Sequence, residues 1–241
     1  MQLRRFSAWF ALLAGSVALA AAPAIALTLP PPTISFNGWQ PGTTALGCTT
    51  EGFVTTCAGS NASPPSGNFT VTNWNLSLDN DPTVTNFFAI QNNLLGAQTF
   101  TITVQIPTAG TFGPPVQITG SVQGGATDAN GTGGVTLSSS APTAMYQALV
   151  DGSPVQTLLN DPQNFTSAVP FGSVSTGFVN FGPTNLGIAA TSSIGITIKF
   201  TLSPGDIASF TSVFNLIPEP GTIVLLATGL VGMAHFGRRR A

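Results

Sequence analysis

Two stretches of strict alternation constrain the fold more than any other feature of the sequence. Between Gln98 and Pro107, four apolar residues alternate with threonine and glutamine, and between Ser193 and Ser203, five apolar residues alternate with glycine, threonine and lysine. Successive side chains of a strand point to opposite faces, so period two indicates half-buried antiparallel strands. Turn signals such as Asn37-Gly38, Asn130-Gly131 and Asp151-Gly152 recur between the apolar runs. The sequence therefore predicts an all-β domain, an antiparallel β-sandwich or jelly roll.

Three segments of this domain depart from the simple pattern. The apolar phase switches near Asn73, which predicts a bulge or bend in the strand. Residues Thr143 to Val150 fit a short helix about as well as a strand, and Asn160 to Gly172 is predicted to be a longer loop.

The N-terminus has the three parts of a secretory signal peptide. Arg4 and Arg5 precede an apolar run from Phe6 to Ala22, and the small residues Ala24 and Ala26 form a cleavage site for signal peptidase. An uncleaved N-terminal anchor is the alternative interpretation. The preferred interpretation makes Leu27 the first residue of an exported chain.

The C-terminus has the pattern of a second targeting signal. Its three parts are a proline-rich motif, an apolar run from Thr222 to Phe236 that predicts a short hydrophobic helix, and a basic cluster of Arg238, Arg239 and Arg240. Fifteen helical residues span about 22 Å, which is short of the roughly 30 Å hydrocarbon core. Because arginine clusters stay cytoplasmic, the basic cluster acts as a stop-transfer signal and the body lies outside the membrane. We therefore divide the chain into a signal peptide (1–26), a β-sandwich body (27–216) and a tail (217–241).

This tail resembles the PEP-CTERM sorting signal of Gram-negative bacteria in its ordered parts, with Pro218, Glu219 and Pro220 as the sorting motif. The resemblance implies recognition by an exosortase, a membrane-embedded transpeptidase, and an association with exopolysaccharide and biofilm material. It also implies an intermediate tethered at the inner membrane that then reaches the cell surface or the extracellular space. A plain C-terminal anchor is the alternative interpretation.

The charges of the body exclude some classes of partner. Charged residues make up 6% of the chain, and Lys199 is the only basic residue of the body, which carries a net charge of about −6. Phosphate backbones are bound chiefly through lysine and arginine, so the sequence predicts no binding to nucleic acid.

Cys48 and Cys57 are the only cysteines, and in an exported chain we expect them to form a disulfide. The only histidine, His235, lies in the tail, so the body cannot build a Ser-His-Asp or Cys-His arrangement. We therefore predict no catalytic residues and no enzyme, although a glycosidase based on two carboxylates such as Asp79 and Asp151 stays formally open.

Two weaker patterns remain. Asp79 and Asp81 flank Asn80 on a predicted turn, and their oxygens could hold Ca²⁺, although a solvated turn is the simpler interpretation and no other cofactor is predicted. A row of threonines at positions 99, 101 and 103 resembles an ice-binding ladder, but it is also typical of any water-facing strand.

Taken together, the sequence predicts an exported structural or interaction protein of the cell surface or extracellular matrix. The main alternative is a carbohydrate-binding module for extracellular polysaccharide, with Trp39 or Trp74 as its stacking platform.

Overall fold

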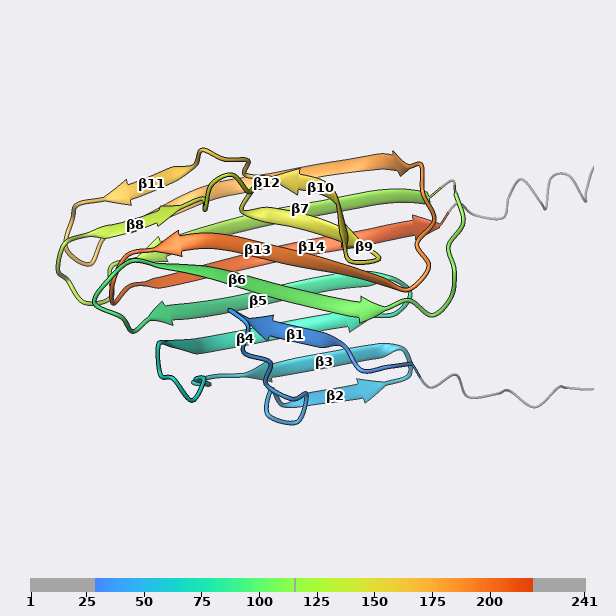
Figure 1. The fold of residues 1–241 in the computed structure, drawn as a ribbon, viewed down its shortest axis with the longest axis horizontal. Coiled ribbons are helices and arrows are strands. Elements are labelled where there is room, and N and C mark those ends of the chain that lie inside the picture. The colour runs from blue at the N-terminus through green and yellow to red at the C-terminus, as the bar shows by residue number, and fades with distance from the viewer. Residues whose placement is uncertain (1–28, 115, 219–241) are drawn as a thin grey trace, which may run out of the picture.

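The alternating segments pair into two antiparallel sheets in the computed structural model, which describes residues 29–114 and 116–218 (Figure 1). The first sheet has the order β1-β6-β13-β8-β11, with β9 and β10 attached beside β13. Its strands are β1 (Thr33–Phe36), β6 (Gln98–Pro107), β8 (Val135–Ser138), β9 (Tyr146–Val150), β10 (Ser153–Leu158), β11 (Asn164–Ser167) and β13 (Ser193–Leu202).

The second sheet has the order β12-β7-β14-β5-β4-β3-β2. Its strands are β2 (Cys48–Glu51), β3 (Val54–Gly59), β4 (Phe69–Asp79), β5 (Thr83–Asn92), β7 (Val116–Thr127), β12 (Ser173–Leu186) and β14 (Ile207–Pro218). Both sheets are antiparallel throughout, and they pack face to face. The all-β sandwich prediction is therefore confirmed.

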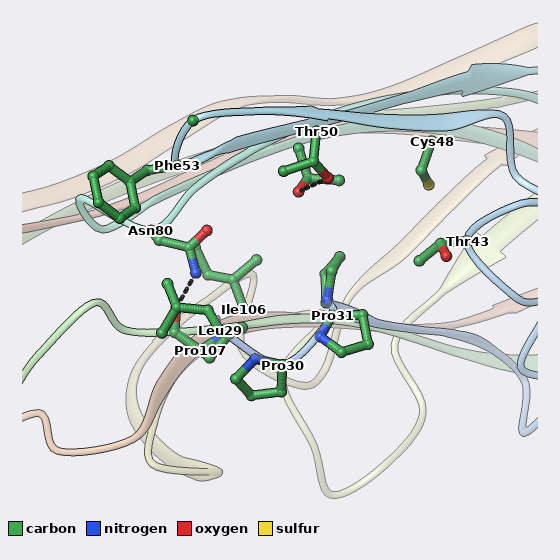
Figure 2. A pocket seen from close by; sticks show the side chains of 13 residues that line it. Leu29, Pro30, Pro31, Thr43, Cys48, Thr50, Phe53, Asn80, Ile106 and Pro107 are labelled. Atoms are coloured by element: carbon green, nitrogen blue, oxygen red, sulfur yellow. Dashed lines mark hydrogen bonds between the residues drawn. The ribbon is translucent and has the colours of Figure 1, made fainter. Parts of the chain in front are cut away.

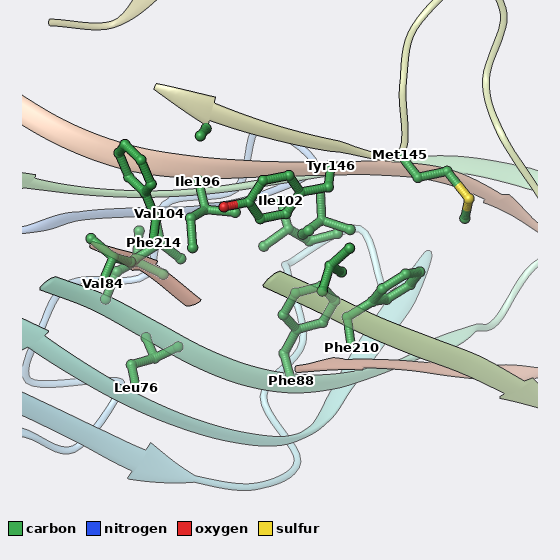
Figure 3. Close-up of a cluster of buried hydrophobic side chains, with 14 of the residues drawn as sticks. Leu76, Val84, Phe88, Ile102, Val104, Met145, Tyr146, Ile196, Phe210 and Phe214 are labelled. Atoms are coloured by element: carbon green, nitrogen blue, oxygen red, sulfur yellow. The ribbon is translucent and has the colours of Figure 1, made fainter. Parts of the chain in front are cut away.

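The core lies between the sheets and consists mainly of isoleucine, leucine and valine, with a group of phenylalanines among them (Figure 3). Phe100 of β6 stacks on Phe200 of β13 with ring centroids 5.4 Å apart, and Phe200 meets Phe210 of β14 at 4.8 Å. Tyr146 of β9 crosses the same space and donates a hydrogen bond from its hydroxyl to the Val213 carbonyl, 3.0 Å away. Desolvation by this burial raises the pKa of the tyrosine. These contacts join the two sheets into one body.

Two of the three segments that departed from the simple pattern contain regular strands. The predicted bulge is confirmed, because the register of β4 against β5 shifts between Val71 and Asn73. The ambiguous segment Thr143 to Val150 contains strand β9 and no helix.

The prediction of a long loop over Asn160 to Gly172 was wrong in part, because β11 runs through its centre and pairs with β8. This strand is only four residues long and half-exposed, so it lacks the apolar alternation that would have revealed it.

The sandwich has two distinct ends (Figure 1). We call the end with the turn 80–82 and the loops 108–114 and 187–192 the tail end, because Leu29 and Pro218 lie there. We call the other end, with the loops 93–97, 128–134, 168–172 and 203–206, the distal end. Across the 12 residues of β14, the two ends are separated by about 40 Å.

Strand β14 extends two residues into the segment assigned to the tail, because Ile217 pairs with Gln117 and Pro218 with Val116. The signal peptide with Ala24 and Ala26, the motif residues Glu219 and Pro220, the hydrophobic helix and the arginine cluster lie outside the described residues. Within residues 29–114 and 116–218, no helix has the length and apolar character needed to cross a membrane.

Candidate functional site

Four loops converge at the distal end, and Asn92 connects two of them. Its buried side chain donates from Nδ2 to the carbonyls of Gly96, Leu202 and Ser203 at 2.9, 3.2 and 3.1 Å. Its Oδ1 accepts the Leu94 amide at 3.0 Å. One side chain thus holds the loop 93–97 against the loop 203–206.

Two aspartates lie beneath these loops because of the strand register. Strands β7 and β14 are neighbours, and Thr127 pairs with Ile207. The next residue along β7 is Asp128, and the residue that precedes Ile207 is Asp206, so the pairing places the two acids side by side. Their exposed fractions are 1% and 0%.

The two carboxylates differ in how they are satisfied. Asp128 accepts backbone amides from Asn130 and Gly131 on Oδ1, at 3.2 and 2.7 Å, and from Phe171 on Oδ2 at 3.2 Å. Asp206 accepts the Ser203 hydroxyl on Oδ2. Its Oδ1 is buried and has no hydrogen-bond partner.

The electrostatics of Asp206 reflect this position. Desolvation raises the pKa of its carboxyl, the Ser203 hydroxyl and the Ala129 main-chain N–H oppose the shift, and the negative charge of Asp128 raises the pKa further. Two adjacent carboxylates out of water do not both stay ionised unless a shared proton or a cation lies between them.

A groove of about 500 Å³ opens beside the aspartate pair, and its floor is uncharged. Asn130 and Ser203 line it, and Asn130 donates from Nδ2 to the Pro204 carbonyl across the groove at 3.0 Å. Leu94 and Leu95 form an exposed apolar rim. The groove therefore combines amide and hydroxyl groups with an apolar edge.

Sequence reasoning did not identify Asp128 or Asp206 as site residues. One local signal was available, the spacing of Asp128, Asn130, Thr132 and Gly133 in a single turn-rich loop. The contribution of Asp206 has no local signal, because it depends on which strands are neighbours.

The predicted cation residues Asp79 and Asp81 take part in a hydrogen-bonded turn at the tail end, where Asp79 accepts the Asp81 amide on Oδ1 at 2.9 Å. Asn80, between them, donates from Nδ2 to the Pro107 carbonyl at 2.6 Å (Figure 2). Asn80 also lines a pocket of about 400 Å³ with Phe53 and the prolines 30–32. The described residues contain no group of three or more histidine, cysteine or acidic side chains that could hold a metal ion, so calcium at Asp79 and Asp81 stays a prediction.

Asp151 lies in the turn between β9 and β10, and its carboxylate holds residues 191–193, where the loop 187–192 leads into β13. Its carboxylate accepts the amides of Thr191, Ser192 and Ser193 and both neighbouring hydroxyls, at 2.7 to 3.1 Å. Partial desolvation acts to raise the pKa of this carboxyl, but the hydrogen bonds from Ser193, Thr191 and Ser192 outweigh it and hold the pKa well below its usual range.

The predicted tryptophan platform is wrong for Trp74. This side chain is 3% exposed, and its Nε1 donates to the Leu46 carbonyl at 2.9 Å inside the body. Trp39 is half-buried against Phe36 and Phe69. A buried indole cannot stack on a sugar.

The remaining predicted residues lie on the strands. Cys48 and Cys57 are paired across β2 and β3 and are joined by a disulfide of 2.03 Å. The threonine row of β6 faces β13, where the hydroxyls of Thr99 and Thr103 meet those of Thr201 and Thr197, at 2.8 and 3.0 Å. Lys199 lies opposite the middle threonine and interrupts the row.

The described residues form an antiparallel β-sandwich with one disulfide and with four loops gathered at the distal end. The family model of the PEP-CTERM protein-sorting motif matches residues 216–241. No curated protein matches the sequence. The motif indicates exosortase-dependent sorting of an exported protein to the cell surface or extracellular space.

Proposed function

We propose that this protein is a non-enzymatic structural or interaction protein of the cell surface or extracellular matrix, with its distal end as the contact surface. The observation that carries the proposal is the position of the sorting motif. Because β14 runs directly into Pro218, the tail leaves the sandwich at one end, and the distal loops lie about 40 Å away from it. A body held by its tail thus presents these loops outward.

The surface chemistry supports contact with a hydrated, uncharged matrix. Paired threonine hydroxyls cover the outer face of β6 and β13, and amide and hydroxyl groups line the distal groove. Lys199 is the only basic residue of the body, so attraction to polyanions is weak. Neutral polysaccharide is the chemistry that such a surface fits best.

The arrangement of the acids supports a role without catalysis. Both oxygens of Asp151 are occupied by the loop 191–193. Asp128 and Asp206 are buried side by side at the ends of paired strands, with exposed fractions of 1% and 0%, so neither carboxylate is open to a sugar substrate.

A carbohydrate-binding module is the second candidate function, and the distal groove favours it. Its rim residues Leu94 and Leu95 could pack against a sugar face beside the uncharged polar groups that line the groove. This version of the hypothesis uses the groove in place of a tryptophan platform.

Cosedimentation of the exported protein with polysaccharide purified from its host tests the proposal. Leu95 is fully exposed, so Leu95→Ser leaves the core intact and should lower retention severalfold. Ile188→Ser at the tail end is the matched control and should leave retention unchanged. The matrix proposal fails if the wild-type protein stays in the supernatant. If Leu95→Ser and Ile188→Ser are retained equally well, the distal end is not the contact surface.

Mass spectrometry of both termini tests the sorting step itself. We expect the protein from its native host to begin at Leu27 and to end near residues 218–221. An intact tail through Ala241 in membranes would make the protein an ordinary anchored ectodomain.

A further inference from the structure

We propose that the distal end binds one divalent cation, Ca²⁺, between Asp128 and Asp206, with the loop 128–134 as its cradle. The inference does not depend on the proposed matrix function, and it concerns residues at the opposite end from the aspartates predicted to bind calcium.

The first observation is an unpaired oxygen. Asp206 is fully buried, and its Oδ1 has no hydrogen-bond partner, whereas its Oδ2 accepts the Ser203 hydroxyl. A buried carboxylate oxygen without a partner costs several kcal/mol if it stays anionic. The neighbouring carboxylate of Asp128 increases this cost, so the site favours a positive charge at the unpaired oxygen.

The protein itself does not supply that charge. In the part of the chain that the structure describes, Lys199 is the only basic side chain. It lies within β13 opposite Thr101, on the outward row of that strand. The positive charge must therefore come from solution.

The loop has the residue types and spacing of a calcium loop. Asp128, Asn130, Thr132 and Gly133 occupy the first, third, fifth and sixth positions of the pattern D-x-[DN]-x-[DN]-G, with threonine in place of the fifth acid or amide. Gly133 has a φ of 82°, the left-handed conformation that the sharp turn at the sixth position requires.

The second loop completes the arrangement. A calcium loop of this kind normally receives a further carboxylate from its twelfth position, and here Ser139 stands there. Asp206 takes that role from the loop 203–206, which the register of β7 and β14 brings to Asp128. Asn130 Oδ1 accepts the amide and the hydroxyl of Thr132 and so shapes the loop. With two carboxylates, the remaining ligands are neutral oxygens from the Thr132 hydroxyl, main-chain carbonyls or water, which suits the six to eight oxygens of Ca²⁺.

Calcium would also join the loops that form the distal groove. Asn130 and Thr132 line the groove from one side, and Ser203 and Gly205 line it from the other. A cation held by both loops would therefore set the shape of the groove.

Thermal unfolding of the full-length chain, purified in mild detergent, tests the inference with CaCl₂ and with EDTA. At about a hundredfold excess over the dissociation constant, Ca²⁺ should raise the Tm by about 5 to 10 °C. Isothermal titration should show one site, with a dissociation constant in the range of about 10⁻⁴ to 10⁻³ M that extracellular calcium modules have.

Asp206→Asn is the decisive variant, because it is expected to fold. Its amide keeps the shape of the side chain and can donate to Asp128, so in EDTA the variant should be at least as stable as the wild type. It should lose the calcium-dependent rise in Tm, whereas Asp79→Asn, the matched control at the tail end, should keep it.

Two results would overturn the inference. If Ca²⁺ raises the Tm of neither the wild type nor Asp79→Asn, the two carboxylates of the distal end share a proton and do not bind a cation. If Ca²⁺ stabilises Asp206→Asn as much as the wild type, and Asp79→Asn loses the effect, calcium binds at the tail end.

Discussion

Replacement of Asn92 by alanine should destabilise the protein more than any other exchange of a polar side chain at the distal end. Asn92 is fully buried at the end of β5, and its amide is the link between the loops 93–97 and 203–206. Alanine fits the strand but removes both N–H donors and the acceptor. The carbonyls of Leu202 and Ser203 then lose the partner that this amide provides.

The magnitude follows from the number of hydrogen bonds. Two N–H groups serve three carbonyls, and Oδ1 accepts one backbone amide, so about three effective bonds are lost. At about 1 kcal/mol net for each bond, the free energy of unfolding should fall by about 3 kcal/mol. For a body of this size, the same change corresponds to a drop of about 6 to 12 °C in Tm.

Urea unfolding followed by tryptophan fluorescence measures this change, because Trp74 is buried and Trp39 is half-buried in the folded body. Asn93→Ala is the control, because Asn93 is exposed and donates only to the Gly67 carbonyl and the Thr70 hydroxyl, both at 3.0 Å. We expect the control to lose less than about 1 kcal/mol. Equal losses in the two variants would refute the argument that Asn92 holds the distal loops together.

Two further predictions concern the tail end and the edge of the second sheet. Asp151→Asn keeps the left-handed backbone at this position and should cost about 1 kcal/mol at neutral pH, a value reduced for solvent exposure. Because the folded-state pKa of Asp151 lies below its unfolded value of about 3.9, the advantage of the wild type is present above that pH and should shrink as the pH falls. A difference that stays constant down to about pH 2 in urea titrations would contradict this assignment. Replacement of Cys48 and Cys57 by serine opens a loop with a sequence separation of 9 and should cost about 2 to 3 kcal/mol, which reduction of the wild type by dithiothreitol should reproduce. If reduced and oxidised protein unfold at the same urea concentration, the disulfide does not stabilise the body.

Most of the fold could be predicted from local patterns. Strict alternation identified β6 and β13 almost to the residue, and the change of phase identified the bulge of β4 near Asn73. Strand β11 was missed, because a half-exposed strand of four residues carries too few apolar side chains to show a period.

The candidate sites differ in how well the sequence predicted them. The sorting motif could be found in the sequence, because a membrane enzyme reads it as a continuous segment. Trp74 was chosen as an exposed platform and proved to be buried, although it alternates in phase with Leu76 and Leu78, and this apolar row indicates the inward face of β4.

The sequence by itself determined the alternating strands β6 and β13, the sorting motif and the scarcity of basic residues in the body, since each depends on neighbouring residues or on composition. The tertiary structure alone decided what lies at the distal end. Asp128 and Asp206 meet because β7 and β14 are neighbours in register, and the order of strands in a sheet is a long-range property of the whole core. The two aspartates stand at the ends of different strands, so no periodicity along the chain relates them, and their contact and their unpaired oxygen exist only in the folded protein.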